Sequence, residues 1–217
     1  MARMKTAVLV SGRGSNMQAI IEAAADPSYP AEIALVISNK QNAPALALAE
    51  AAGIATHALP HKDFADRNSF DAEMTKLIAA AGCELVVLAG FMRLLSTSFC
   101  ERWQDRLINI HSSLLPAFKG LDVHQRMIDA GVRFAGCTVH FVRPEMDTGP
   151  IIAQAVVPVH ASDDADALAA RILTQEHRIY PLAVQWIAEG RVRISGEVVR
   201  VQGVSPPEGA LINPANP

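Results

Sequence analysis

The sequence predicts a doubly wound α/β fold, in which helices cover both faces of a mostly parallel sheet. Short runs rich in Val, Ile and Leu alternate along the chain with longer segments of helical pattern, as in successive βα units. These runs are apolar at consecutive positions, which is typical of strands buried on both faces. Of the 217 residues 50% are hydrophobic but only 5% are aromatic, so aliphatic side chains are expected to form the core.

Strands are predicted where several apolar residues follow one another and polar or glycine-rich segments bound the run. The expected strands are residues 6–11, 33–38, 55–58, 84–88, 107–111, 134–142 and 151–159. A terminal hairpin is expected over residues 192–199, because the Ser195-Gly196 pair separates two short apolar runs.

Helices are predicted between the strands, and their ends carry stop signals. Pro27 ends the first helix, because the residue before a proline avoids the α region. Gly53, Gly82 and Gly131 stand where glycine closes a helix. Pro181 is expected to bend or break the long C-terminal helix. The expected helices are residues 15–25, 44–52, 68–81, 96–103, 124–130 and 164–189.

A single domain is expected for residues 1–204, because no repeat, low-complexity tract or domain-sized linker interrupts the alternation. The long helix and the hairpin complete this domain at its C-terminal end. From residue 205 onward Pro, Gly and Asn dominate, so residues 205–217 are expected to form a flexible tail.

Composition and charge exclude several classes of partner. The formal net charge is −3 and no long basic run is present, so no nucleic-acid partner is expected. No apolar stretch approaches the ~20 residues of a membrane span, and the N-terminus shows no secretory signal pattern. The three cysteines lack a CxxC spacing and fit reduced, buried residues. The sequence therefore predicts a cytoplasmic protein that does not engage a membrane.

Residues 11–16, Ser-Gly-Arg-Gly-Ser-Asn, join the first strand to the first helix. Glycines let a backbone approach an anion, and the free N–H groups of a helix start point at it. Met17 occupies the third glycine position of a dinucleotide fingerprint, and the lysine of a Walker loop is missing, so a phosphomonoester fits better than NAD or ATP. The other interpretation is a tight turn, in which Ser15 caps the helix and Gln18 closes a capping box.

Asn109 and His111 lie two residues apart on a predicted strand, so their side chains project from the same face. Open α/β sheets bind ligands where such strands end. Asn109 can donate a hydrogen bond to an oxyanion. A nearby Asp147 favours the imidazolium form of His111, which would then serve as a general acid near neutral pH. Taken singly, His111 is as well explained as a hydrogen-bonded core histidine, and Asp147 as a turn-forming residue.

Other chemistries are weaker on this sequence. A metal site of His111, His140 and Asp147 is conceivable, but their spacing is not typical of metal ligands, and no metal is expected. A serine hydrolase is disfavoured, because no G-x-S-x-G elbow is present. On the long helix Glu176 falls on the apolar stripe, so it faces inward and needs either a ligand or a buried Arg or His. The apolar loop 90–95 either lines a pocket for a flat heterocycle or packs in the core.

Several segments of the chain resemble the folate-dependent phosphoribosylglycinamide formyltransferases of purine synthesis. They cover nearly everything from Thr6 to about Val201 and follow the family's order. The Asn-x-His pair and the later Asp are shared with other formyltetrahydrofolate enzymes, whereas the glycine-rich loop and the TQEH segment are more specific. The matching segments are SGRGSNMQAII, ISNK, AGI, VVLAGFMRLLS, LINIHSSLLPAFKG, GCTVHFV, MDTGPII and TQEHRIYPL.

The resemblance implies a formyltransferase-like, Rossmann-type fold that transfers a formyl group from 10-formyltetrahydrofolate, the co-substrate, to the amine of glycinamide ribonucleotide. The N-terminal half would hold the nucleotide phosphate, and the C-terminal half the folate and the catalytic trio. Whether the chain is a monomer or a homodimer stays open. The implied catalytic residues are Asn109, His111 and Asp147; the nucleotide would contact Gly14, Ser15, Asn16 and Glu176; the folate would contact Arg67, Met92, Arg93, Leu94, Leu95, Asn109, Arg143, Pro144, Glu145, Met146 and Asp147.

The chain departs from the family's pattern at three positions. Ser112 replaces a proline that is common after the histidine, and Leu173 stands where some members have a polar residue near the nucleotide. Asp122 stands where relatives often carry histidine, and a second acid near Asp147 could alter the pH profile or the ordering of water.

Three rival functions share parts of this pattern. A formyltetrahydrofolate hydrolase uses a similar trio with water as the attacking group, but usually adds an N-terminal regulatory domain, whereas this chain begins at the first strand. Methionyl-tRNA formyltransferases add a C-terminal RNA-binding domain, which is not expected here. A non-catalytic nucleotide-binding module would keep the phosphate loop and use the trio structurally. Closure of the loop 143–147 over a folate is a further hypothesis.

Overall fold

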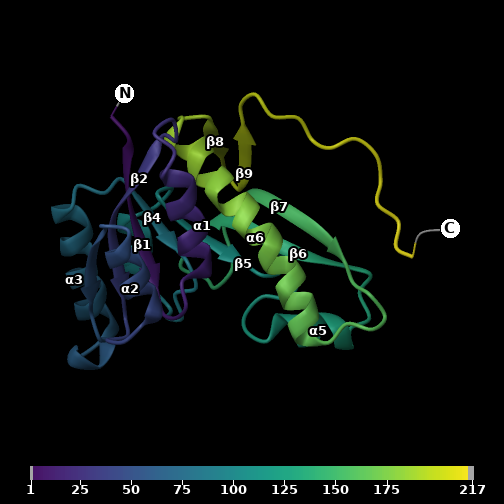
Figure 1. The fold of residues 1–217 in the computed structure, drawn as a ribbon, viewed down its shortest axis with the longest axis horizontal. Coiled ribbons are helices and arrows are strands. Elements are labelled where there is room, and N and C mark those ends of the chain that lie inside the picture. The colour runs from purple at the N-terminus through teal and green to yellow at the C-terminus, as the bar shows by residue number, and fades with distance from the viewer. Residues whose placement is uncertain (1, 215–217) are drawn as a thin grey trace.

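In the computed structural model, which describes residues 2–214, one sheet runs in the order β3-β2-β1-β4-β5-β6-β7-β9-β8 (Figure 1). The strands are β1 (Met4–Val10), β2 (Ala31–Ser38), β3 (Ala55–Ala58), β4 (Leu85–Leu88), β5 (Leu107–His111), β6 (Phe134–Phe141), β7 (Ile151–Pro158), β8 (Val192–Ser195) and β9 (Val198–Val201). The helices are α1 (Ser15–Ala24), α2 (Pro44–Ala51), α3 (Arg67–Ala80), α4 (Thr97–Arg102), α5 (Val123–Asp129) and α6 (Ala165–Ala188), with a short 3₁₀ turn η1 at His61–Asp63.

Every predicted strand and helix is present, with ends that differ from the predictions by a few residues at most. Of the two outcomes expected at Pro181, a bend or a break, the break does not occur, because α6 continues through this residue as one helix of 24 residues. Tyr180 and Pro181 are both buried. The packing of this buried face of α6 stabilises the helix more than the one backbone hydrogen bond missing at Pro181 destabilises it.

The chain reverses its direction of travel across the sheet between β1 and β4. From β1 it passes to β2 and β3 on one side, and β4 and β5 then continue on the other side. These five strands are parallel, whereas β6 pairs antiparallel with both β5 and β7. Doubly wound sheets bind ligands at the carboxyl ends of the strands where the order reverses, so the crevice beside β1 and β4 is the expected site.

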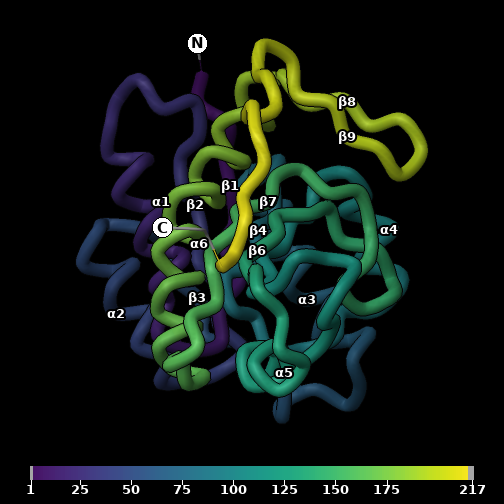
Figure 2. Tube along the Cα trace, turned by 90° about the vertical axis from the view of Figure 1, so that its right-hand side faces the viewer, coloured from purple at the N-terminus to yellow at the C-terminus, as the bar shows by residue number. Residues whose placement is uncertain are grey.

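Alternation along β1 shows how the two faces of the sheet are covered. Val8 and Val10 belong to the apolar cluster that includes side chains of α1, α2 and α6. Ala7 and Leu9 point to the opposite face and join the cluster formed with α3 and α4. Figure 2 shows these two groups of helices on opposite sides of the sheet. A third cluster packs α5 and α6 against β6 and β7.

Residues 205–214 contain neither helix nor strand. The side-chain amide of Asn213 donates hydrogen bonds to the carbonyl oxygens of Arg133 and Val159. The expectations for residue 1 and for residues 215–217 lie outside the described residues. Within residues 2–214, none of the helices combines the length and the apolar character that crossing a bilayer requires.

Candidate active site

His111 at the end of β5 lies beside Asp147 in the loop between β6 and β7. Nδ1 of His111 is 3.5 Å from Oδ1 of Asp147, and each side chain is 11% exposed. Nε2 of His111 lies 2.9 Å from the carbonyl oxygen of Phe118. Both neighbours accept hydrogen bonds, so the imidazolium form is the one that can donate to both. The structure therefore places the side chains of His111 and Asp147 next to each other, as the sequence predicted.

Asp147 is fixed in an unusual backbone conformation. Its φ is 51°, in the left-handed region that residues other than glycine rarely adopt. The backbone N–H of Gly120 donates to Oδ2 of Asp147 at 2.7 Å, which leaves Oδ1 directed at His111. Strained backbone of this kind concentrates at functional sites, where the surrounding structure holds it.

Asn109 is oriented by His140, which the sequence suggested only as a metal ligand. The two residues are paired across β5 and β6, and Nδ2 of Asn109 lies 3.3 Å from Nε2 of His140. Nδ1 of His140 faces the carbonyl oxygens of Phe141 and Thr148, so it carries the hydrogen and Nε2 is the acceptor. Burial lowers the pKa of His140, which keeps the ring neutral. One N–H of the Asn109 amide is thereby used, and the other stays available for a substrate oxygen.

A metal centre of His111, His140 and Asp147 receives no support from the geometry. Within residues 2–214, no group of three or more His, Cys, Asp or Glu side chains is arranged to hold a metal ion.

The glycine-rich loop ends in Gly14, which is the N-cap of α1 with φ 81° and makes no side-chain cap. The alternative interpretation of this loop, a capping box formed by Ser15 and Gln18, is therefore wrong, and Gln18 instead donates to Glu22. Because α1 begins at Ser15, its first N–H groups have no acceptor within the helix. A Cβ on Gly14 would lie 2.6 Å from Cβ of Ala45, so the loop backbone rests directly on α2.

Glu176 on α6 reaches this loop from the opposite side. It is 5% exposed, and Nδ2 of Asn16 donates to its Oε2 at 2.7 Å. The hydroxyl of Ser112 donates to its Oε1 at 2.5 Å. The sequence left open whether Glu176 meets a ligand or a buried Arg or His; its hydrogen-bond partners in the structure are an amide and a hydroxyl. One turn further along α6, the hydroxyl of Tyr180 donates to the carbonyl oxygen of Leu88 and fixes the helix against the sheet.

Ser11 connects the carboxyl ends of β1 and β4. Its buried hydroxyl donates to Oδ1 of Asn39 and accepts a hydrogen bond from the backbone N–H of Met92 at 2.7 Å. The backbone N–H of Ser11 also donates to the carbonyl oxygen of Gly90. The glycine-rich loop and the segment that follows β4 are thus held side by side, although they are far apart in the sequence.

The residues expected to contact folate include apolar side chains that face solvent. Met92, Leu94 and Met146 are 67%, 56% and 52% exposed. Met92 and Leu94 follow β4 in the segment that Ser11 holds, and Met146 directly precedes Asp147. Exposed apolar side chains near polar sites are typical of ligand surfaces. Arg93 stacks over the ring of Phe70 at 5.7 Å, and its buried Nε has no hydrogen-bond partner among the described residues. Arg143 instead pairs with Asp105 at 2.8 Å.

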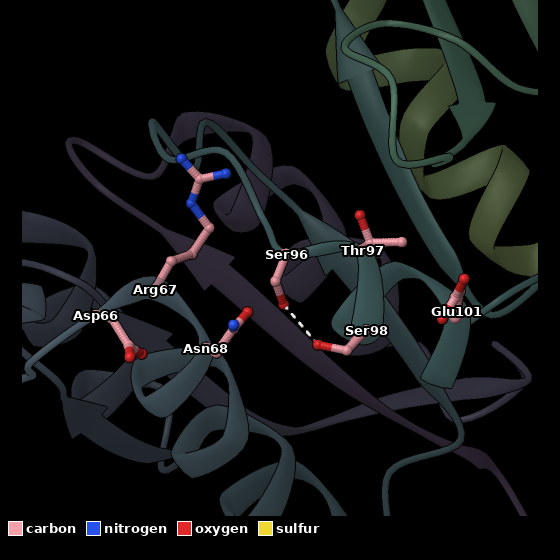
Figure 3. A pocket seen from close by; sticks show the side chains of 7 residues that line it. All are labelled: Asp66, Arg67, Asn68, Ser96, Thr97, Ser98 and Glu101. Atoms are coloured by element: carbon pink, nitrogen blue, oxygen red, sulfur yellow. Dashed lines mark hydrogen bonds between the residues drawn. The ribbon is translucent and has the colours of Figure 1, made fainter.

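Arg67 begins α3 and lines an open hollow of about 630 Å³ between the starts of α3 and α4 (Figure 3). The hollow is separate from the catalytic trio, none of whose members lines it. It adjoins the segment that follows β4, because the backbone N–H of Ser96 donates to Oδ2 of Asp71 on α3. Its lining residues are Asp66, Arg67, Asn68, Ser96, Thr97, Ser98 and Glu101.

In this α/β fold an amide and a histidine on β5 lie together with a carboxylate from the loop between β6 and β7, a set of groups that acyl-transfer chemistry uses. A family model described as formyl transferase matches residues 4–184. The chain belongs to the formyl transferase family.

The chain is 44% identical over 207 residues to the phosphoribosylglycinamide formyltransferase of Escherichia coli (strain K12), covering 95% of this chain and 98% of that protein. It is also 44% identical over 199 residues to the trifunctional purine biosynthetic protein adenosine-3 of Gallus gallus. The match includes 92% of this chain and 20% of that protein. The chain thus spans about a fifth of that larger relative.

Solved structures agree with this assignment. The glycinamide ribonucleotide transformylase 1 of Symbiobacterium toebii superimposes with a TM-score of 0.90 at 43% identity, covering 92% of this chain and 94% of that chain. A formyltetrahydrofolate deformylase of Burkholderia mallei ATCC 23344 is less similar, with a TM-score of 0.84 and 31% identity over 92% of this chain and 70% of its own. The fold alone therefore does not separate a transferase from a hydrolase.

Proposed function

We propose that the chain transfers the formyl group of 10-formyltetrahydrofolate to the amine of 5'-phosphoribosylglycinamide, giving formylglycinamide ribonucleotide and tetrahydrofolate in de novo purine synthesis. The observation that carries this proposal is the meeting of His111, Asp147 and Asn109 with a second polar site, formed by Glu176 and the glycine-rich loop. Likeness to a phosphoribosylglycinamide formyltransferase over nearly the whole of both chains supports it.

The catalytic trio acts on the formyl group that the bound folate supplies. The free N–H of Asn109 donates to the formyl oxygen as negative charge develops there during attack by the substrate amine. Nδ1 of His111 stays paired with Asp147, while its Nε2–H turns from the carbonyl oxygen of Phe118 to the formyl oxygen, where it donates a second hydrogen bond and can deliver a proton. The proton lost by the attacking amine reaches the departing folate nitrogen through His111 and Asp147. Asp147 keeps the imidazole oriented throughout.

We assign the nucleotide to the start of α1. The phosphate would rest on the backbone N–H groups of Gly14, Ser15 and Asn16, where the helix dipole favours an anion. Glu176 retains unused acceptor positions for the hydroxyl groups of the ribose, because each carboxylate oxygen receives only one hydrogen bond from the protein. This arrangement fits a phosphomonoester that carries a sugar.

We assign the folate to the exposed apolar side chains beside this site. Met92, Leu94 and Met146 would cover the flat pterin ring, together with Leu95, Arg93 and the loop of Arg143, Pro144, Glu145 and Asp147. Arg67, at the rim of the neighbouring hollow, would meet the acidic end of the co-substrate. No metal is needed for this chemistry.

The catalytic unit that we propose is residues 1–204, in which the helix α6 and the β8–β9 hairpin complete the sheet. We assign the protein to the cytoplasm, supported by three cysteines that are buried and unpaired within the described residues. Glycinamide ribonucleotide and formyltetrahydrofolate would be its binding partners.

A formyltetrahydrofolate hydrolase is the nearest rival. It would need the folate site and the trio but no site for a phosphorylated amine. The glycine-rich loop, Asn16 and Glu176 would then have no ligand, although Oδ1 of Asn16 is buried without a partner among the described residues. We therefore favour the transferase.

The decisive experiment follows loss of the formyl group from 10-formyl-5,8-dideazafolate by absorbance, with and without glycinamide ribonucleotide. Rapid turnover only with the nucleotide is expected. Turnover without it would identify a hydrolase. Replacing Asn109 or His111 with alanine should lower kcat about 10²- to 10⁴-fold with the fold intact. Unchanged kcat in both variants would leave a binding module as the better description.

A further inference from the structure

Ser112 directly follows His111 and points away from the catalytic pair, toward the nucleotide site. Its hydroxyl donates to Oε1 of Glu176 at 2.5 Å, and the two residues are 64 positions apart in the chain. The amide of Asn16 donates to the other oxygen of Glu176, 160 positions away from it. Three segments that are distant in sequence thus meet on one carboxylate.

We propose that Ser112 is a positioning residue for the nucleotide: its hydroxyl locks the carboxylate of Glu176 into the orientation that receives the sugar, and so sets the affinity for the phosphorylated substrate. This inference rests on the function proposed above. It assigns to the residue after the catalytic histidine a role in substrate binding rather than in proton transfer.

The electrostatics of Glu176 require such a partner. The residue is 5% exposed, and a buried carboxylate is costly unless donors surround it. Among the described residues no Arg or Lys pairs with it, and its two hydrogen-bond donors, the amide of Asn16 and the hydroxyl of Ser112, are neutral. If Ser112 loses its hydroxyl, Oε1 keeps no donor, and the carboxylate can rotate away or bind water.

The orientation of Asn16 depends on the same contact. Because Nδ2 of Asn16 is committed to Glu176, its Oδ1 faces the other way. That oxygen is buried and has no hydrogen-bond partner among the described residues. A buried acceptor without a donor is the feature that a ligand hydroxyl or N–H would satisfy. Ser112 therefore fixes Glu176, and Glu176 in turn fixes the acceptor of Asn16.

The test compares Ser112→Thr with Ser112→Val, which have the same shape and differ only in the hydroxyl. Binding of glycinamide ribonucleotide is measured by isothermal titration calorimetry without folate, and kcat and both KM values are measured with 10-formyl-5,8-dideazafolate. Ser112→Val should weaken nucleotide binding about 5- to 50-fold, as expected for a lost hydrogen bond to a charged group. The KM for the folate and kcat should change less than about threefold, and Ser112→Thr should bind nearly as tightly as the parent.

Ser28→Ala is the matched control, because Ser28 makes the same kind of bond to a carboxylate, that of Asp26, on an exposed loop. It should bind the nucleotide like the parent protein. A double-mutant cycle with Glu176→Ala, which leaves no acceptor for the Ser112 hydroxyl, then tests the route of the effect. If Ser112 acts through Glu176, Ser112→Val should cost less than about twofold in the Glu176→Ala background.

The outcomes separate the two proposals. Equal nucleotide affinity of the Thr and Val variants in an active transferase would overturn the role of Ser112 and leave the proposed function standing. If Ser112→Val weakened nucleotide binding equally in the parent and in the Glu176 variant, Ser112 would act independently of Glu176, which would also overturn the inference. A parent protein that neither binds nor formylates the nucleotide would overturn both.

Discussion

Nε2 of His140 lies 3.3 Å from Nδ2 of Asn109, across the antiparallel pairing of β5 and β6. The neutral ring accepts one N–H of the amide and leaves the second to face the site. This contact connects the orientation of the proposed oxyanion donor with the protonation state of a histidine that is 1% exposed. The ring is itself held by the carbonyl oxygens of Phe141 and Thr148 at Nδ1.

His140→Ala should lower kcat about 10- to 100-fold, because the Asn109 amide loses the acceptor that aims it and small misplacements of catalytic groups are costly. His140→Gln can present a side-chain oxygen to the same amide and should retain more of kcat. Steady-state kinetics with saturating substrates measure the effect. His160→Ala, at an exposed position, is the control. Equal kcat in His140→Ala and the parent would show that Asn109 needs no orienting partner.

Stability should fall on the acid side because of the same residue. Burial lowers the pKa of His140 below its ordinary value of 6.5, and burial acts in the same direction on His124. As the pH falls below 6.5 the unfolded chain gains protons that the folded protein does not. The stability that the neutral His140 contributes is therefore fully present above pH 6.5 and is lost as the pH falls toward the lower pKa of the folded protein. Urea unfolding from about pH 8 to about pH 5 should show a shallower decline for His140→Gln than for the parent; equal slopes would contradict the prediction.

Gly14→Ala should damage the glycine-rich loop. A side chain there would meet Cβ of Ala45 at 2.6 Å and would have to adopt a φ of 81°. We expect a loss of about 1–3 kcal/mol in the free energy of unfolding and nucleotide binding weakened by about tenfold or more. Gly12→Ala is the matched control in the same loop, since a Cβ added at Gly12 would meet nothing within 4 Å. Equal stability of the two variants, measured by thermal unfolding, would refute the steric argument.

The bidentate pair of Asp163 and Arg171 should stabilise the start of α6. The two guanidinium nitrogens lie 2.6 and 2.7 Å from the carboxylate oxygens, and hydrogen bonding to Arg171 holds the pKa of Asp163 at about 2. Asp163→Asn should cost about 1–2 kcal/mol at neutral pH. Because the folded pKa lies below the ordinary 3.8, this stability is present above 3.8 and is lost as the pH falls through about 2. Denaturant unfolding of Glu73→Gln, which breaks the exposed pair with Lys76, should show a smaller loss.

Local signals in the sequence were sufficient for the elements of the fold. Gly53 and Gly131, predicted to close helices, do follow α2 and α5 with φ values of 74° and 65°. The run Leu107–His111 forms β5 over its predicted range. These features depend on neighbours within a few positions, which the sequence displays directly.

The partners of the site residues could not be predicted in the same way. Which residue of β6 faces Asn109 depends on the register of an antiparallel pairing between strands more than twenty positions apart, and no local pattern sets it. The inward position of Glu176 was predicted, but its contacts with Asn16 and Ser112 arise only when three distant segments pack together. The capping box at Ser15 failed for a different reason: Gly14 adopts a left-handed conformation and takes the cap position itself.

Removal of residues 205–217 should leave a functional enzyme. The family match ends at residue 184, and the last strand of the sheet ends at Val201. Leu211 and Ile212 in the tail are 71% and 75% exposed, so they contribute little to the core. We expect kcat/KM within about twofold of the parent and a loss of less than about 1 kcal/mol in stability, since the tail's contacts are few hydrogen bonds.

The comparison for this truncation is a chain that ends at residue 190 and so also lacks the β8–β9 hairpin. Val192, Ile194 and Val199 of the hairpin pack against the main apolar cluster, whereas the tail adds no buried apolar side chain to it among the described residues. Thermal unfolding and the formyl-transfer assay should therefore separate the two truncations, with a large loss of stability only for the shorter chain. If removing residues 205–217 alone lowered activity more than about tenfold, the tail would belong to the catalytic unit, and its attachment through Asn213 to the ends of β6 and β7 would be the first contact to examine.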